Sequence, residues 1–241
     1  MTFLVASGKG GVGKSTLTCA IAEALAKREK RVLVIDGDAG LRCQDILLGV
    51  SDRVVYDWGD VLCGNIGVAD AVLTTEKGVD LLPAPSYWSP DFSADIFASM
   101  VTALSHRYDI IFIDAPAGVG PGLKLLCKAT KLALIVSGSD AAGVRGACSA
   151  GDALRAEGIS AVRLLINSVK PSLIRKKNLP DLDSVIDRTG LRLIGLLPYD
   201  EGIANAAAVG NFAPEKFPLF ARAADAVARR LTGENVPLTK M

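Results

Sequence analysis

The amino-acid sequence predicts an α/β fold, in which a doubly wound and mostly parallel sheet carries helices on both faces. Two observations carry this prediction. The short apolar segments are continuous runs of Val, Ile and Leu, which is typical of strands buried on both faces. Segments with helical periodicity separate these runs along the whole chain. Such an alternation indicates a parallel sheet with its ligand site at the carboxyl ends of the strands.

The predicted elements follow one another in a regular order. The expected strands are residues 2–7, 31–36, 79–84, 108–116, 132–137, 161–167 and 192–198. The expected helices are residues 14–28, 140–158 and 217–231. In the first helix, Leu17, Ile21 and Leu25 form a stripe that should face the core. Because no linker, repeat or low-complexity segment interrupts the order, residues 1–241 are expected to form a single domain, with residues 232–241 as a short, flexible tail.

Composition excludes several classes of function. Half of the 241 residues are hydrophobic, which is enough for a sizeable core, and the net charge of +1 gives no electrostatic basis for binding nucleic acid. Five scattered cysteines without a C-x-x-C pair, together with one histidine, argue against a zinc site and fit a reducing cytosol. The apolar start of the chain is too short for a signal peptide, and no apolar run approaches the about 18 residues of a membrane span. We therefore expect a cytoplasmic protein.

A glycine-rich loop follows the first expected strand. The segment "SGKGGVGKST" (residues 7–16) contains the pattern G-x-x-x-x-G-K-[ST], and a strand before it and a helix after it provide the context that this motif requires. Its glycines let the backbone bend so that successive N–H groups converge on phosphate oxygens. These glycines are Gly10, Gly11 and Gly13. The positive end of the following helix also favours phosphate, so the loop predicts a nucleoside-phosphate site.

The side chains at the end of the loop have separate expected tasks. Lys14 should reach the β- and γ-phosphates, and the hydroxyl of Ser15 should ligate Mg²⁺. Thr16 should donate to the α-phosphate. The loop also contains a second lysine, Lys9, which the phosphate-binding pattern itself does not need.

Two later strand ends supply carboxylates on the same edge of the sheet. Asp36 ends one strand and Asp38 follows it, while Asp114 ends another strand after four apolar residues. Asp114 fits an acid that holds Mg²⁺ through water, and Asp38 is free to reach an attacking water. The alternative for either acid is helix capping or turn formation.

Together, these segments resemble the MinD/ParA family of deviant-Walker ATPases, which have the P-loop NTPase fold. The family's K-G-G-x-G-K-[ST] loop matches residues 9–15, its D-x-D segment matches residues 36–38, and its D-x-P-x-G switch matches residues 114–118. Two further segments, "DGDAGLRCQDILLGV" and "LLPYDEGIANAAAVG", are similar to the MinD branch of the family. The resemblance extends from Thr2 to Leu231, which is nearly the whole chain.

The resemblance implies roles at the matched positions. Lys9 would reach across a dimer interface to the partner's phosphates, where it would act in catalysis with Lys14 and Asp38. Asp38, Asp114 and Gly118 would be the switch residues, and Asp114 and Gly118 would sense the γ-phosphate. The implied nucleotide-binding residues are Gly10, Gly11, Val12, Gly13, Lys14, Ser15, Thr16, Asn167, Pro198, Tyr199 and Asp200, and the implied metal site comprises Ser15, Asp36 and Asp114.

The implied activity is that of an ATP-driven switch. The chain would bind ATP or ADP with Mg²⁺, form a homodimer with ATP, and hydrolyse ATP slowly under stimulation by a protein activator or effector, in division-site selection or intracellular positioning. ATP is favoured over GTP because "NSVK" at residues 167–170 is not the guanine-reading N-K-x-D pattern. The alternatives are an ATPase that matures or inserts a metal cofactor, against which the lack of paired cysteines argues, and a scaffold that binds nucleotide without hydrolysing it.

The C-terminal end departs from the MinD pattern. MinD proteins usually end in a short basic amphipathic helix that binds membrane, whereas "TGENVPLTKM" (residues 232–241) contains Gly233, Pro237 and a single lysine. The helix expected at residues 217–231 should dock on the core through its apolar stripe. The tail therefore gives no support for peripheral membrane association and leaves membrane contact open.

Overall fold

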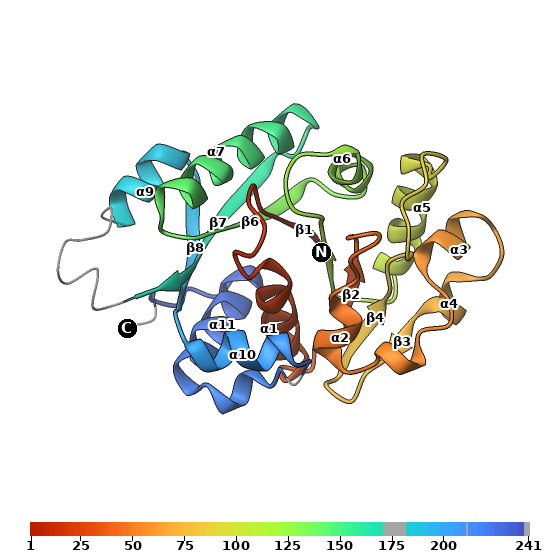
Figure 1. Cartoon of the computed structure of the whole chain (residues 1–241), viewed down its shortest axis with the longest axis horizontal. Helices are drawn as coiled ribbons and strands as arrows, with labels where there is room; N and C mark the ends of the chain where they lie inside the picture. Colours follow the sequence, from red (N-terminus) through yellow and green to blue (C-terminus); the bar gives the residue numbers. More distant parts are fainter. Residues whose placement is uncertain (171–181, 211, 239–241) are drawn as a thin grey trace.

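A parallel sheet forms the centre of the molecule (Figure 1). The structure is a computed structural model that describes residues 1–170, 182–210 and 212–238. In these residues eight strands pair in the order β3-β4-β2-β5-β1-β6-β7-β8. Every neighbouring pair is parallel except β3 and β4. The strands are β1 (Thr2–Ala6), β2 (Val32–Asp36), β3 (Leu73–Thr74), β4 (Val79–Leu82), β5 (Ile110–Asp114), β6 (Leu132–Ser137), β7 (Ala161–Val169) and β8 (Arg192–Pro198).

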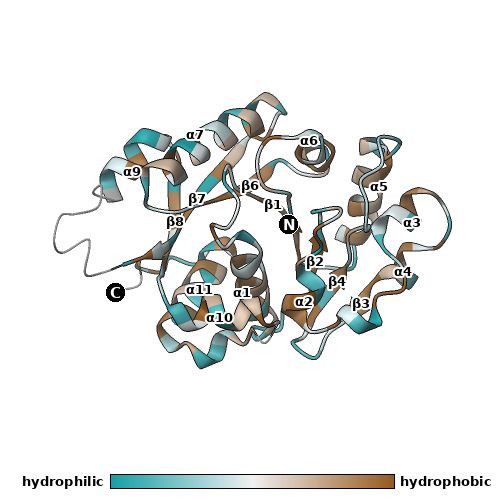
Figure 2. Cartoon of the chain, viewed as in Figure 1, coloured by the Kyte–Doolittle hydropathy of each residue, from teal (hydrophilic) through white to brown (hydrophobic). Residues whose placement is uncertain are grey.

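Helices cover both faces of the sheet and create two hydrophobic cores. One core lies under α1 (Lys14–Ala26), α2 (Gln44–Leu48), α10 (Glu201–Ala208) and α11 (Pro218–Leu231). The other lies under α3 (Trp58–Leu62), α4 (Val68–Ala71), α5 (Ala94–Ser105), α6 (Pro121–Cys127), α7 (Ala141–Ala156) and α9 (Leu182–Thr189). In β1, Phe3 and Val5 enter the first core, while Leu4 and Ala6 enter the second. Figure 2 shows the hydrophobic residues concentrated on the strands and on the helix faces that meet them.

The observed elements confirm the predicted fold class. All seven expected strands are present, with ends that agree within two residues, and the three expected helices correspond to α1, α7 and α11. The sequence prediction missed β3, which is only two residues long and pairs antiparallel with β4. It also missed α5, which is capped by the Ser93 hydroxyl accepting from the N–H of Ile96, and several helices of four to eight residues.

The last helix and the segment after it lie against the body of the protein. α11 buries Phe220, Val227 and Leu231, as expected for a helix that docks on the core. In the last turn of α11, the guanidinium of Arg230 donates to the carbonyl oxygens of Val236, Pro237 and Ile194 at 2.9, 2.5 and 2.8 Å. Residues 239–241 of the expected tail lie outside the described residues, and the flexibility of residues 232–241 stays a prediction.

A search of the described helices for a membrane-crossing segment found none that combines sufficient length with sufficient apolar character.

Candidate functional site

The phosphate loop, residues 7–13, connects β1 to α1 and needs glycine at several positions. Gly11 and Gly13 have φ values of 73° and 85°, in the left-handed region that favours glycine. A Cβ on Gly13 would collide with the amide nitrogen of Asn167, and a Cβ on Gly8 would collide with the carbonyl of Gly146 in α7. Glycine is therefore required by the φ values of the turn at Gly11 and Gly13. It is also required by the close approach of Asn167 to Gly13 and of α7 to Gly8.

Lys14, at the start of α1, points into the interior beneath this loop. Its side chain is only 7% exposed, and its Nζ lies 2.8 Å from Oδ1 of Asp114 and 3.3 Å from the hydroxyl of Ser15. The same Asp114 oxygen accepts from the Thr18 hydroxyl at 3.1 Å. The structure therefore brings together the predicted phosphate lysine and two of the three predicted metal ligands.

Asp36 is the neighbour of Asp114 on the adjacent strand. The two residues are in register across β2 and β5, and each is 1% exposed. The carboxylate of Asp36 accepts from the backbone N–H groups of Asp38, Cys43 and Gln44 at 2.9–3.0 Å. Burial, with the nearby charge of Asp114 as a second cause, raises the pKa of Asp36 to about 7.

This acid pair fits a Mg²⁺ site. Two buried carboxylates, Asp36 and Asp114, share one buried ammonium, that of Lys14, so a further cation would be electrostatically favoured there. Within the described residues no three His, Cys, Asp or Glu side chains form a closed metal site. Mg²⁺ usually takes one or two carboxylates together with substrate phosphates and water, and Asp36 with Asp114 would supply two carboxylates.

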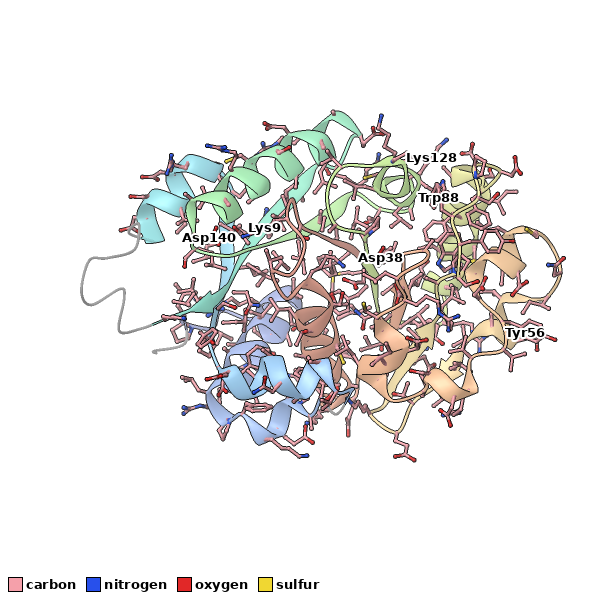
Figure 3. The ribbon with its side chains drawn as sticks, in the orientation of Figure 1. Lys9, Asp38, Tyr56, Trp88, Lys128 and Asp140 are labelled. Carbon is pink, nitrogen blue, oxygen red and sulfur yellow. The ribbon has the colours of Figure 1, made fainter. Side chains whose placement is uncertain are left out.

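Asp38 lies just beyond the end of β2. Its side chain is half buried, and burial is the main cause that raises its pKa, while the Lys14 ammonium acts in the opposite direction. A raised pKa brings a carboxylate closer to the range in which it can exchange a proton at neutral pH. In Figure 3, Asp38 lies toward α3 and α5, well apart from Lys9 and Asp140.

Lys9 has a different environment from Lys14. Its side chain is 50% exposed, and its Nζ lies 3.6 Å from Oδ1 of Asp140. Asp140 also caps α7, because the same oxygen accepts from the N–H groups of Ala142 and Gly143 at 3.1 and 3.0 Å. These contacts, led by the one to Gly143, lower the pKa of Asp140.

The predicted switch segment contacts the phosphate loop through one hydrogen bond and runs close to it at a second position. The N–H of Gly118 donates to the carbonyl of Ser7 at 2.9 Å, and the φ value of Gly118 is 84°. An added Cβ on Gly10 would lie 3.9 Å from the Cβ of Ala117. A change in the loop can therefore be transmitted directly to residues 114–118.

A cleft of 290 Å³ lies beside the loop, where a nucleotide base would fit. It is lined by Gly11, Val12, Gly13, Thr16, Asn167, Ser168, Pro198, Tyr199, Asp200, Ile203, Ala204, Ala207 and Phe220. The Asn167 amide donates to the carbonyl of Val12 at 2.8 Å, and Asp200 caps α10 through the N–H of Gly202. The cleft thus unites Asn167, Pro198, Tyr199 and Asp200 with the loop, as the resemblance implies.

A larger cavity of 720 Å³ lies elsewhere, between α1, α11 and residues 236–238. It contains no residue of the phosphate loop and neither of the two buried acids. We therefore place the candidate site at the smaller cleft and the acid pair, because the charged groups and the loop converge there.

Sequence reasoning missed two residues of this site. Gln44 donates through Nε2 to Asp114 at 2.9 Å and to the Ser15 carbonyl at 3.1 Å, while its buried Oε1 has no hydrogen-bond partner in the described structure. Trp58 donates through its indole N–H to the Asp36 carbonyl at 2.7 Å. Gln44 lies within the MinD-like segment at residues 36–50, but that resemblance assigns it no role, and only the fold brings Gln44 and Trp58 to the acids.

The chain is similar in sequence to known nucleotide-binding proteins. The sequence profile of the CobQ/CobB/MinD/ParA nucleotide binding domain matches residues 3–212. The chain is 34% identical over 239 residues to the septum site-determining protein MinD of Synechocystis, covering 97% of this chain and 90% of that protein.

Two solved structures are also similar to this chain. The MinC:MinD cell division protein complex of Aquifex aeolicus superposes with a TM-score of 0.91 at 31% identity, covering 99% of this chain and 98% of that one. The septum site-determining protein MinD of Pyrococcus horikoshii, in complex with Mg-ADP, has a TM-score of 0.84 at 25% identity and covers 97% of both chains.

Proposed function

Since the chain belongs to the CobQ/CobB/MinD/ParA nucleotide-binding domain family, we propose that it is a MinD-like ATPase switch. It binds Mg-ATP, forms a homodimer in that state, and hydrolyses ATP to release the dimer, in division-site selection or intracellular positioning. The observation that carries this proposal is the convergence of the phosphate loop, the buried acid pair and the cleft at Asn167 on one edge of the sheet. Residues 1–241 act in it as a single ATPase domain.

The site residues fit ATP with Mg²⁺. Ser15, Asp36 and Asp114 would hold the metal, directly or through water, and the metal would neutralise charge on the phosphates. The solved P. horikoshii relative with Mg-ADP supports the same choice of nucleotide and metal. Asn167 and the residues at 198–200 would hold the base in the cleft beside the loop.

The chain's own groups then perform defined tasks. The backbone N–H groups of the loop hold the phosphate oxygens, and Lys14 exchanges its contact with Asp114 for the β- and γ-phosphates. Asp38 orients the attacking water and, with its pKa raised by burial, can accept a proton from it. Gly118, bonded to Ser7, transmits loss of the γ-phosphate contacts to the switch segment.

Lys9 completes the site of the other subunit. Its exposed side chain and its long contact with Asp140 leave it available to a neighbouring molecule. A cation supplied in this way resembles an arginine finger, which stabilises charge in the transition state and raises rates by about 10³–10⁵.

The experiment that tests this proposal measures molecular mass by light scattering with ATP and with ADP. Asp38→Ala slows hydrolysis and serves as the parent protein. We expect this parent to be a dimer with ATP and a monomer with ADP, and the Lys9→Ala, Asp38→Ala protein to be a monomer with both, while calorimetry shows that it still binds ATP. An ATP-dependent dimer that survives Lys9→Ala would contradict the assigned role.

A protein partner acts on this switch. The A. aeolicus relative is part of a MinC:MinD complex, which supports a protein activator or effector for this chain. Immobilised Asp38→Ala protein loaded with ATP should retain a partner that the ADP-loaded protein does not, and equal retention in the two states would contradict a nucleotide-controlled interaction.

The protein works in the cytoplasm, and α11 with residues 236–237 packs on the protein itself. Two observations support this view. The apolar face of α11 packs on the core, and the Arg230 guanidinium donates to the carbonyls of residues 236 and 237. Co-sedimentation with anionic vesicles in ATP and in ADP tests it, since strong ATP-dependent pelleting of the protein that is lost when residues 232–241 are removed would overturn it.

A further inference from the structure

Lys77 contacts three elements of the fold, and no sequence motif predicts these contacts. It lies in the turn between β3 and β4, and its ammonium reaches Oε1 of Glu23 at 3.0 Å, the carbonyl of Leu47 at 2.8 Å and the carbonyl of Phe212 at 2.5 Å. A lysine ammonium has three N–H donors, so each donor has one acceptor. These acceptors belong to α1, to the end of α2 and to the segment that follows α10.

The first contact is a buried ion pair with the helix that begins at the phosphate lysine. The side chain of Glu23 is 4% exposed and that of Lys77 is 24% exposed. Burial raises the pKa of Glu23, and the Lys77 charge opposes this shift. The thiol of Cys19 donates to the same carboxylate oxygen at 3.4 Å. Without Lys77, Glu23 would be a buried carboxylate with no compensating cation among these contacts.

The second contact fixes the far end of α2. This helix ends at Gly49, which has a φ value of 72°, and the carbonyl of Leu47 is one of its last acceptors. At its other end, Gln44 bonds Asp114 and Ser15, and its backbone N–H bonds Asp36. Because α2 is only five residues long, a shift of its last turn moves its first turn too.

The third contact fixes the wall of the base cleft. The ring of Phe212 meets that of Phe220 edge to face, with ring centroids 6.3 Å apart, and Phe220 lines the cleft. The Lys77 ammonium also lies 5.7 Å from the centroid of the Phe212 ring. Nearby, a Cβ on Gly210 would lie 3.1 Å from Cγ2 of Ile46, so the segment after α10 touches α2 directly.

We propose that Lys77 is a positioning residue for ATP turnover. Its ammonium holds α2 and Phe212 at a fixed position relative to α1, and so fixes the distance between the base cleft and the acids. Lys77 acts through Gln44 and Phe220 without touching the nucleotide itself. This proposal rests on the proposed ATPase function and adds a residue to it that belongs to neither the phosphate loop nor a switch.

The experiment distinguishes the positioning role of Lys77 from its role in neutralising the charge of Glu23. Lys77→Met should lower both the melting temperature and the turnover of ATP, because it removes the carbonyl contacts and leaves Glu23 unpaired. Glu23→Gln together with Lys77→Met removes both charges. This double variant should regain most of the melting temperature, yet keep an about tenfold weaker ATP affinity by calorimetry and a reduced kcat, because Leu47 and Phe212 still lack their donor.

Two single variants provide the controls. Glu23→Gln leaves the Lys77 contacts to Leu47 and Phe212 in place and should turn over ATP like the wild type. Lys27→Met removes a neighbouring exposed lysine, which lies 3.7 Å from Glu215, and should leave both readouts unchanged. Wild-type ATP affinity and kcat in the double variant would overturn the proposal, whereas an inactive wild-type protein would contradict the ATPase function itself.

If the double variant does not fold, Lys77→Arg decides the question. Arginine keeps the positive charge but presents its donors in a planar fork, so it cannot reproduce three diverging contacts. A weaker ATP affinity at an unchanged melting temperature supports positioning. Wild-type affinity in this variant overturns it.

Discussion

The phosphate-binding segment, residues 7–16, contains two lysines with opposite environments: Lys14 in its inner region, at the start of α1, and Lys9 in its outer region, in the loop. Lys14 is 7% exposed and lies 2.8 Å from a carboxylate that is itself 1% exposed. Lys9 is 50% exposed and lies 3.6 Å from an aspartate that is 56% exposed. They are only five positions apart in the sequence, but one belongs to the interior of its own subunit and the other to the surface.

In the proposed dimer, this difference would let one segment serve two molecules. A buried ion pair in which one partner is removed leaves a strongly unfavourable charge, whereas an exposed pair contributes about 0–1 kcal/mol. Lys14 is therefore committed to the network of Asp114, Thr18 and Gln44. Lys9 can leave Asp140 at little cost in free energy, so a phosphate from a second subunit can compete for it.

Removing the inner lysine should have the largest effect. Lys14→Ala should reduce the free energy of unfolding by about 3–5 kcal/mol, because Asp114 stays buried without its cation. It should also reduce ATP turnover by about 10²–10³-fold, the usual effect of losing one preorganised donor. Urea denaturation and a phosphate-release assay measure the two effects.

Matched variants sharpen this prediction. Lys14→Ala combined with Asp114→Asn should recover stability, because the unpaired buried carboxylate is no longer charged. It should not recover turnover, because the phosphates still lack the Lys14 ammonium. Lys9→Ala, in the outer part of the same loop, should change the free energy of unfolding by less than about 1 kcal/mol. Equal stability of the Lys14→Ala and Lys9→Ala proteins would remove the distinction between the two regions.

Sequence patterns predicted the strands and the phosphate loop better than the residues that hold them in position. The strands and the loop were predictable, because continuous apolar runs and glycine spacing are local signals. The contacts of Gln44 with Asp114 and of Lys77 with Phe212 join residues 70 and 135 positions apart. Such contacts depend on the order of the strands, which places β2 beside β5. The short helix α2 gives no periodicity of its own, so its role as a bridge could not be inferred.

The acids of the inner region should make folding depend on pH. The pKa of Asp36 rises from 3.8 to about 7 in the folded protein, chiefly through burial. Between these values the folded protein binds more protons than the unfolded chain, so stability falls as the pH rises through this window. The slope should be at most about 1.4 kcal/mol per pH unit. Denaturation in EDTA from pH 5 to pH 8 measures it.

Two substitutions test whether Asp36 causes this slope. Asp36→Asn should flatten the dependence between pH 5 and pH 7. Asp109 provides a contrast, because the Arg31 side chain lowers its pKa and its titration lies below this window, so Asp109→Asn should keep the slope. If the Asp36→Asn protein retained the full pH dependence, another group would have to be responsible.

The smallest effect is expected in the outer region, at Asp140, the partner of Lys9. A substitution there should strengthen dimerisation, whereas the substitutions above weaken stability or turnover. Asp140→Asn keeps the oxygen that accepts from Ala142 and Gly143, so the cap of α7 is retained, but it removes the charge that holds Lys9. Since an exposed ion pair is worth at most about 1 kcal/mol and a homodimer contains two of these pairs, ATP-dependent dimerisation should tighten by at most about 30-fold. Sedimentation in ATP, in the hydrolysis-deficient Asp38→Ala background, measures this change. Asp140→Ala should be less stable because it loses the cap. If Asp140→Asn instead weakened the dimer, Asp140 would assist Lys9 in the ATP state, and the loose contact at 3.6 Å would be part of the assembled site.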